Sequence, residues 1–200
     1  SIRRQRQMCI RDRSGTTDTL VQLAQRIINA QWQEAEEAVA ALEARYHSVI
    51  EELFETPALR KEVWQALAPI FTELQSQTHN EAFTQNDEKR ILSRGEIIST
   101  TLMAFTLREY ENLNAVHLDA LSFMRINHNG EPEPQHIEKH LTPLLTAAPD
   151  PNALFLTEGY ICINAFGEID NLRRGGSDYT ATLVGEAAHA ETIEIWTDID

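Results

Sequence analysis

The sequence NLRRGGSDYT occupies residues 171–180, between a segment rich in β-branched and aromatic residues and an amphipathic segment. Its adjacent glycines, Gly175 and Gly176, let the backbone approach an anion closely, and Ser177 can cap the helix that follows. A helix N-terminus offers free N–H groups and a partial positive charge, and an arginine beside it adds a planar fork for a carboxylate or phosphate. The loop matches neither the Walker A pattern nor Gly-x-Gly-x-x-Gly. These residues therefore predict either an anion site or a plain glycine turn before a capped helix.

The first half of the chain, upstream of this loop, reads as helical. Apolar residues recur there at intervals of three and four, which predicts amphipathic helices. Pro69 falls inside the third of them, where a proline should kink or split the helix. The predicted helices cover residues 17–30, residues 35–53, a segment that Thr56 caps and Pro57 begins, and a segment from Asn86 or Asp87 to about Tyr110.

Beyond residue 110, short strands alternate with helices. The predicted strands lie within residues 115–118, 153–164 and 192–196, and the predicted helices cover residues 134–145 and 177–190. Such alternation implies βα units and a mainly parallel sheet. We therefore expect one α/β domain with a helical excursion near its N-terminus.

Composition excludes several classes of partner. The 200 residues suffice for one domain with a full core. A formal charge of −14 makes a nucleic-acid partner or an anionic membrane unfavourable, because phosphate binding needs clustered Lys and Arg. No apolar run approaches the roughly 20 residues that span a bilayer. Two cysteines, Cys9 and Cys162, cannot make a disulfide framework, so we expect a cytoplasmic location.

Residues 1–13, SIRRQRQMCIRDR, differ from the acidic chain that follows. They hold five Arg and one Asp without apolar periodicity, and they lack the apolar run of a secretory signal. They resemble a translated adapter, so we expect a non-native segment; a disordered basic arm is the alternative. The chain begins in a turn at residues 14–17 and stops at Asp200 directly after a predicted strand, so we expect a fragment.

Three segments, in order along the chain, resemble aspartokinases of the amino-acid kinase superfamily. They are SRGEIIS at residues 93–99, LRRGGSDYT at residues 172–180 and IWTDID at residues 195–200, with FMR at 123–125 and TEGYI at 157–161 between them. The resemblance covers the chain from Ser14 onward. It implies the amino-acid kinase fold, a three-layer α/β sandwich with a mainly parallel sheet, and a partial catalytic domain over residues 14–200.

The resemblance also implies how the amino-acid substrate is bound. Glu96 matches the carboxylate that engages the α-amino group of aspartate. Arg174 matches the arginine that pairs with a substrate carboxylate, a task that suits a bidentate guanidinium and not a lysine. Thr17 and Ser177 match further contacts to aspartate.

Other residues are implied to act on the phosphates. Gly175 and Gly176 form the phosphate loop, and Asp178 matches the acid that organises the groups around the transferred phosphoryl. Thr197 and Asp198, at the end of the last predicted strand, match the start of the nucleotide site. In open α/β sheets such sites lie beyond the carboxyl ends of the strands.

The implied reaction is transfer of the γ-phosphoryl of ATP to the β-carboxylate of L-aspartate, with Mg²⁺ bridging the β- and γ-phosphates. The full-length protein is expected to be a homo-oligomer. The family carries a Lys-Phe-Gly-Gly signature that this sequence lacks, so we expect the chain itself to be nearly inactive. Another amino-acid kinase, or a non-catalytic subunit that binds amino acid or nucleotide, remains the alternative.

Some residues look like sites but have simpler explanations. His136 and His140 are spaced as metal ligands are on a helix, yet Glu138 lies between them and no third ligand is evident, so a surface helix is expected. Cys162 has no neighbouring histidine and is expected to be a core thiol. Arg173 stands where the family commonly has glycine, and it could share the carboxylate contact of Arg174.

Overall fold

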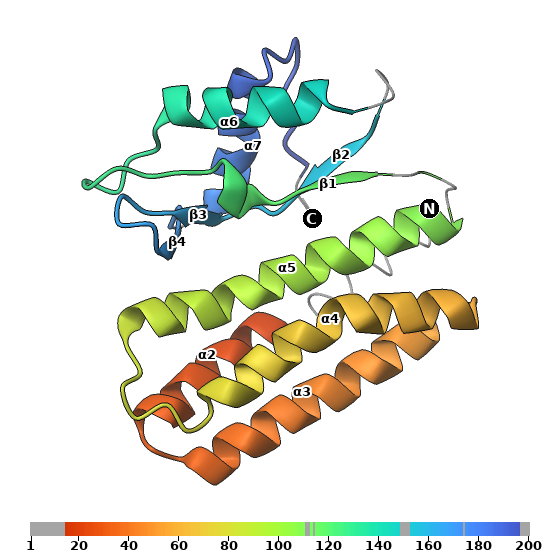
Figure 1. Cartoon of the computed structure of the whole chain (residues 1–200), viewed down its shortest axis with the longest axis vertical. Coiled ribbons are helices and arrows are strands. Elements are labelled where there is room, and N and C mark those ends of the chain that lie inside the picture. The colour runs from red at the N-terminus through yellow and green to blue at the C-terminus, as the bar shows by residue number, and fades with distance from the viewer. Residues whose placement is uncertain (1–14, 111–112, 114, 149–152, 174, 197–200) are drawn as a thin grey trace. The chain divides into compact units, whose positions relative to one another are not determined.

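The computed structural model describes residues 15–110, 113, 115–148, 153–173 and 175–196. The chain forms two compact units, which divide between Leu113 and Asn114. A helical unit comes first (red to green in Figure 1), and a mixed unit of strands and helices follows (green to blue). The segment 1–13, for which an adapter-like origin is expected, lies outside the described residues.

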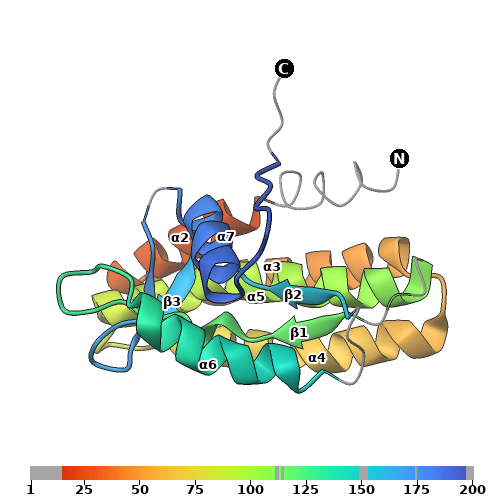
Figure 2. The same ribbon diagram turned by 90° about the horizontal axis from the view of Figure 1, so that it is seen from above.

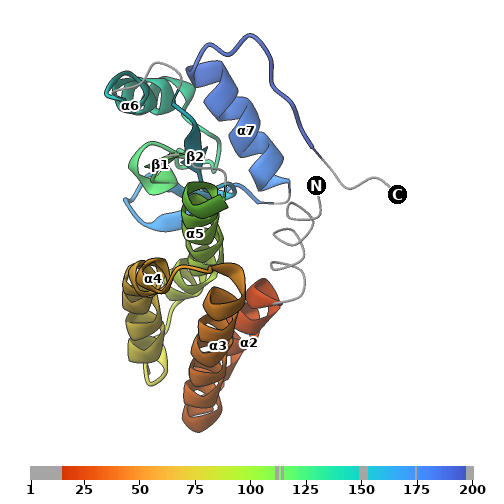
Figure 3. The same cartoon turned by 90° about the vertical axis from the view of Figure 1, so that its right-hand side faces the viewer.

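Within the described residues, the helical unit consists of four helices that pack in a closed order. Helix α2 lies on α3, α3 on α4, α4 on α5 and α5 on α2, as Figures 1 and 3 show. The four predicted helices are thereby confirmed. Their bounds are α2 (Thr16–Ile28), α3 (Trp32–Leu53), α4 (Pro57–Gln77) and α5 (Gln85–Tyr110).

The core of this unit comes from the apolar stripes that the sequence periodicity predicts. Each helix turns one face inward, and burying one such side chain contributes about 1.5–3 kcal/mol. Among the described residues, no helix combines the length and the apolar character that crossing a membrane requires. Side chains that are at most 1% exposed include Leu20, Leu23, Leu42, Leu67, Leu74 and Ile98.

Pro69 does not split α4, which runs unbroken from Pro57 to Gln77. A proline removes one backbone hydrogen bond from the helix interior. Leu67 and Phe71, on either side of Pro69, are both buried in the core, and this packing holds the helix together across the missing bond. Pro57 occupies the first helical position as predicted.

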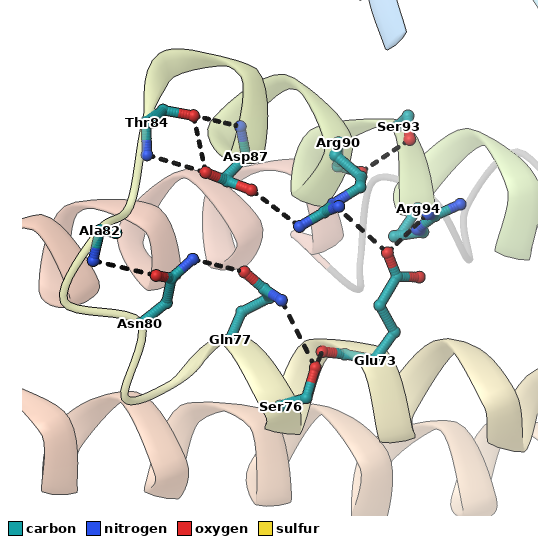
Figure 4. Close-up of polar contacts among 10 residues, drawn as sticks. All are labelled: Glu73, Ser76, Gln77, Asn80, Ala82, Thr84, Asp87, Arg90, Ser93 and Arg94. Atoms are coloured by element: carbon teal, nitrogen blue, oxygen red, sulfur yellow. Dashed lines mark hydrogen bonds and ion pairs between the residues drawn. The ribbon is translucent and has the colours of Figure 1, made fainter. Parts of the chain in front are cut away.

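Thr84 caps helix α5, so the prediction of Asn86 or Asp87 as the cap was wrong. The Thr84 N–H donates to Asp87 Oδ2 at 2.9 Å, and the Asp87 N–H donates to Thr84 Oγ1 at 3.3 Å. This reciprocal pair is a capping box, which satisfies N–H groups that the first turn leaves unpaired (Figure 4).

A polar cluster joins α4 to the N-terminal half of α5. Arg94 Nη2 donates to Glu73 Oε1 at 2.7 Å, and Arg90 Nε lies 3.5 Å from the same oxygen. Arg90 also pairs with Asp87 at 2.7 Å (Figure 4). The cluster therefore ties the capping box to α4 and holds α5 in register directly before Gly95.

The mixed unit contains two pairs of strands. Strand β1 (Val116–Leu118) pairs in parallel with β2 (Phe155–Thr157), and Figure 2 shows the two side by side. Strand β3 (Ile161–Ile163) pairs antiparallel with β4 (Ile169–Asn171), and β4 was not predicted. The 3-10 turn η1 (Ala120–Ser122) follows β1. Helices α6 (Pro134–Thr146) and α7 (Gly176–Ala187) pack on each other, and the α/β class is confirmed.

The strand predicted over residues 192–196 does not form. Its alternating apolar residues would suit a strand, but among the described residues no neighbouring strand pairs with it. Without a partner, a strand leaves its backbone groups and side chains in water. Accordingly Ile193 and Ile195 are more than two-fifths exposed, and Trp196 is 86% exposed.

Candidate active site

Thr17 and Glu96 line one pocket of the helical unit, between the first turn of α2 and the middle of α5. The pocket is open on one side and has a volume of about 50 Å³. Glu96 is half-buried and Thr17 is exposed. The structure thus brings together two of the predicted substrate residues. Thr16, Tyr46, Ser99 and Thr106 also line this pocket.

A buried hydrogen bond shapes the wall beside Thr17. Thr16 Oγ1 and the Tyr46 hydroxyl lie 2.8 Å apart, and both residues are at most 5% exposed. Sequence reasoning places Tyr46 only in an apolar stripe and does not single out Thr16. The signal that could have found them is their polarity on a face that is otherwise apolar.

Gly95 lies where α2 packs on α5 at this pocket. A Cβ at Gly95 would stand 3.4 Å from Leu20 Cδ1 and 3.8 Å from the methyl group of Thr16, which are ordinary van der Waals distances. The first turn of α2, with Thr17, therefore lies close to the segment of α5 that carries Glu96, although the packing there does not require a glycine.

The predicted phosphate loop opens helix α7 in the mixed unit. Gly175 is the N-cap residue, with φ of 75°, and Gly176 is the first helical residue. A left-handed conformation of this kind favours glycine. The expectation that Ser177 caps the helix was wrong, because Gly175 already occupies the cap position and Ser177 lies within the first turn without a side-chain cap bond.

Close packing against the turn at residues 159–160 holds this loop in place. A Cβ at Gly176 would stand 2.7 Å from Tyr160 Cδ2, so no side chain fits there. A Cβ at Gly159 would stand 3.0 Å from Ser177 Oγ. Thr180 Oγ1 accepts a hydrogen bond from the Tyr160 N–H at 3.0 Å and donates to the Gly176 carbonyl at 2.8 Å.

The predicted residues fall into two groups. Thr17 and Glu96 belong to the helical unit, whereas Gly175, Gly176, Ser177 and Asp178 belong to the loop and first turn of α7 in the mixed unit. Asp178 is exposed, and a carboxylate in the first turn suits the helix dipole. Arg174, Thr197 and Asp198 lie outside the described residues.

A buried carboxylate next to the loop, Glu158, was not singled out from the sequence. It follows β2 and is 1% exposed. Its Oε1 accepts a hydrogen bond from His117 Nε2 at 2.6 Å, and its Oε2 accepts one from the Ala120 N–H at 3.0 Å. The pair links the end of β2 to β1 and η1, directly before the turn at residues 159–160.

Both partners of this pair have shifted pKa values. Burial alone would raise the pKa of the Glu158 carboxyl, but hydrogen bonds from His117 and the Ala120 N–H outweigh burial and hold that pKa below its usual range. The hydrogen bond to Glu158 raises the pKa of His117, although burial opposes this. Each shift favours the charged form of its group.

His136 and His140 lie one turn apart on α6, and Cys162 lies in the core. His136 and His140 stack with ring centroids 3.9 Å apart, and the His140 Nδ1–H donates to the His136 carbonyl at 2.8 Å. No group of three or more His, Cys, Asp or Glu in the described part of the chain could hold a metal ion. Cys162 is fully buried in β3.

The chain is similar to known proteins over most of its length. The amino acid kinase family model matches residues 32–200. The chain is 31% identical to lysine-sensitive aspartokinase 3 of Escherichia coli over 188 residues, which is 93% of this chain and 40% of that protein. It is 33% identical over 112 residues to bifunctional aspartokinase/homoserine dehydrogenase 2 of the same organism, which covers 54% of this chain and 13% of that protein.

Solved structures agree with this result. A crystal structure of Escherichia coli aspartokinase III in complex with aspartate and ADP matches with a TM-score of 0.71 and 30% identity, over 92% of this chain and 40% of that chain. The Clostridium acetobutylicum aspartate kinase matches with a TM-score of 0.67 and 19% identity, over 92% and 37%, which supports the fold alone. The chain thus spans about 40% of the length of lysine-sensitive aspartokinase 3 of Escherichia coli. Since the family model covers most of its residues, the chain belongs to the amino acid kinase family.

Proposed function

We propose that the protein containing this chain transfers the γ-phosphoryl group of ATP to the β-carboxylate of L-aspartate. The product is 4-phospho-L-aspartate, and the reaction is the first step in the synthesis of lysine, threonine and methionine. The supporting observation is the likeness, over 92% of the chain, to an aspartokinase solved with aspartate and ADP. Neither another amino-acid kinase nor a non-catalytic binding subunit has a comparable observation in its favour.

In this proposal the helical unit receives the amino end of aspartate. The Glu96 carboxylate pairs with the α-ammonium group, and the hydroxyls of Thr16, Thr17 and Tyr46 line the same small pocket. A pocket of about 50 Å³ suits one end of an amino acid. Arg174 and Ser177 bind the carboxylates, because a guanidinium fork and a hydroxyl both donate to oxygen.

The glycine loop and the first turn of α7 receive the phosphoryl group. A helix N-terminus stabilises negative charge, and the bare backbone of Gly175 and Gly176 allows close approach. Asp178 orients the reacting groups, while Thr197 and Asp198 contact the nucleotide. Mg²⁺ bound to the β- and γ-phosphates would neutralise part of their charge.

The chemistry asks little of a general base. A carboxylate is ionised at neutral pH and attacks the γ-phosphorus with an oxygen lone pair, while the bond from phosphorus to the β–γ bridging oxygen of ATP breaks and ADP leaves. The protein contributes alignment of the two reactants and electrostatic stabilisation of the phosphoryl oxygens. This division of labour explains why the implied site residues are binding groups and not strong bases.

The test uses the protein expressed from its own gene, with ADP release measured in the presence of Mg-ATP and L-aspartate. The Glu96→Gln variant keeps the size of the side chain and removes its charge. We expect it to raise the KM for aspartate at least about tenfold, because a charge-assisted contact contributes about 1.5–3 kcal/mol. Glu52→Gln, on the exposed face of α3, is the matched control and should leave the KM unchanged.

The outcomes separate the candidate functions. Absence of ADP release with aspartate would refute the proposal. Release with a different amino acid would identify another amino-acid kinase. Binding of aspartate and Mg-ADP without turnover would identify a regulatory subunit.

Further parts of the proposal concern the whole protein. We propose a cytoplasmic location, supported by the low cysteine count of the sequence, and assembly as a homo-oligomer. Residues 14–200 would belong to the catalytic domain. The family lysine signature is not in this sequence, so the 200-residue chain alone should show little activity. Assaying the chain beside the protein from its own gene tests this directly.

A further inference from the structure

Backbone strain in the described residues gathers at the glycine loop. Four residues other than glycine have positive φ. Ala30 and His189 lie just after α2 and α7, where the N–H groups of each and of the next residue bond back to the helix, so they are ordinary helix ends. The other two are Tyr160, with φ of 72°, and Arg173, with φ of 64°. Both lie next to the loop, and the Leu172 N–H donates a hydrogen bond to the Tyr160 carbonyl at 2.8 Å, which joins the two segments.

The backbone of Arg173 does not need an arginine. Its N–H donates to Asn171 Oδ1 at 3.0 Å, and its carbonyl accepts from the Gly176 N–H at 3.0 Å. A glycine at residue 173 would make both bonds without the steric cost of a Cβ at positive φ. The fold of the loop therefore gives no reason for a large side chain here.

The side chain of Arg173 is exposed and its donors are unused. Among the described residues, no carboxylate pairs with it and no acceptor bonds to it. Its Nη2 lies 3.2 Å from the position that a Cβ of Gly130 would occupy, so the guanidinium rests on bare backbone of the turn at residues 127–131. The guanidinium thus lies on this turn, and the backbone of Arg173 is two residues before Gly175, the N-cap of α7.

We propose that Arg173 is a substrate-binding residue that adds a second guanidinium to the loop and sets affinity for an oxyanion of one substrate. The inference rests on the proposed function, because a carboxylate of aspartate or a phosphate of ATP supplies that oxyanion. Strain at a residue whose side chain does nothing for the fold is typical of functional positions. The competing explanation is a structural role, in which Arg173 stabilises the loop by packing on Gly130.

The decisive variants are Arg173→Gly, Arg173→Ala and Arg173→Lys in the protein expressed from its own gene. Arg173→Gly removes both the fork and the strain. We expect its KM for one substrate to rise about tenfold with kcat within about twofold, as for one charge-assisted contact at an exposed site. Its Tm should stay equal or rise by a few degrees. Arg173→Ala keeps the strain, so it should show the same KM and a lower Tm than Arg173→Gly.

The readouts separate this inference from the function on which it rests. A higher KM for aspartate identifies a carboxylate as the ligand, a higher KM for ATP identifies a phosphate, and Arg173→Lys should be intermediate because it keeps the charge without the fork. Unchanged KM values for both substrates, or a lower Tm in Arg173→Gly than in the unsubstituted protein, would overturn the inference and indicate a structural role. An inactive unsubstituted protein would instead refute the proposed function. In that case calorimetric titration with L-aspartate and with Mg-ADP tests the role of Arg173. We expect Arg173→Gly to bind one of the two ligands about tenfold more weakly than the unsubstituted protein does. Equal affinities of the two proteins for both ligands would refute the inference.

Discussion

Replacing Glu158 by alanine tests how the turn that supports the glycine loop is held. The substitution leaves the buried Ala120 N–H without an acceptor, which costs about 1–3 kcal/mol. It also removes the ion pair with His117, whose side chain is 38% exposed, so water screens this pair and its share is about 0.5–1 kcal/mol. Together these losses should lower the free energy of unfolding by about 1.5–4 kcal/mol. Glu158→Gln keeps an acceptor for the Ala120 N–H and should lose about 1 kcal/mol.

The effect should depend on pH with a sign that follows from the two pKa shifts. Because the pKa of Glu158 is lowered from 4.5, its contribution is present above that value and is lost as pH falls through the lower folded pKa. Because the pKa of His117 is raised from 6.5, its contribution is complete below that value and is lost as pH rises through the higher folded pKa. The difference in stability between the unsubstituted protein and Glu158→Ala should therefore be greatest between pH 4.5 and pH 6.5.

The assay is urea unfolding followed by circular dichroism at several pH values, with hydrogen exchange to locate the change. Faster exchange is expected in peptides covering residues 116–122 and 155–163. A loss smaller than about 1 kcal/mol at pH 6, or a loss that is the same at pH 6 and pH 9, would contradict the reasoning. The pair of Glu158 and His117 would then contribute little to the free energy of unfolding.

Two other substitutions test local features. Gly176→Ala places a Cβ 2.7 Å from Tyr160, so the loop must move; we expect a loss of about 1–3 kcal/mol and a strong loss of activity, measured by unfolding and ADP release. Gly185→Ala, later in the same helix, places a Cβ 2.5 Å from Cδ1 and Cγ1 of Ile193, an exposed side chain that can rotate away, and it serves as the control. Thr84→Ala removes the cap that pairs with Asp87 and should cost about 1 kcal/mol, which Thr84→Ser should largely restore.

The sequence by itself determined the elements whose signals are local. Apolar residues at intervals of three and four predicted the four helices of the first unit, because a helix buries one face and its period is a property of the chain alone. The glycine pair likewise marked the start of α7, since a left-handed cap residue favours glycine. The segments that resemble aspartokinases pointed to the family that the comparisons then showed.

Only the tertiary structure decided which residues meet. His117 and Glu158 come from different strands, and neither has a local pattern that points to the other. Thr16 and Tyr46 meet because α2 packs on α3, and the segment 192–196 stays irregular because among the described residues no strand lies beside it. Helix α5 is capped at Thr84, and not at Asn86 or Asp87, because Thr84 and Asp87 form the reciprocal hydrogen bonds of the capping box. Contacts of this kind depend on packing between distant segments, and a single sequence carries no periodic signal for them.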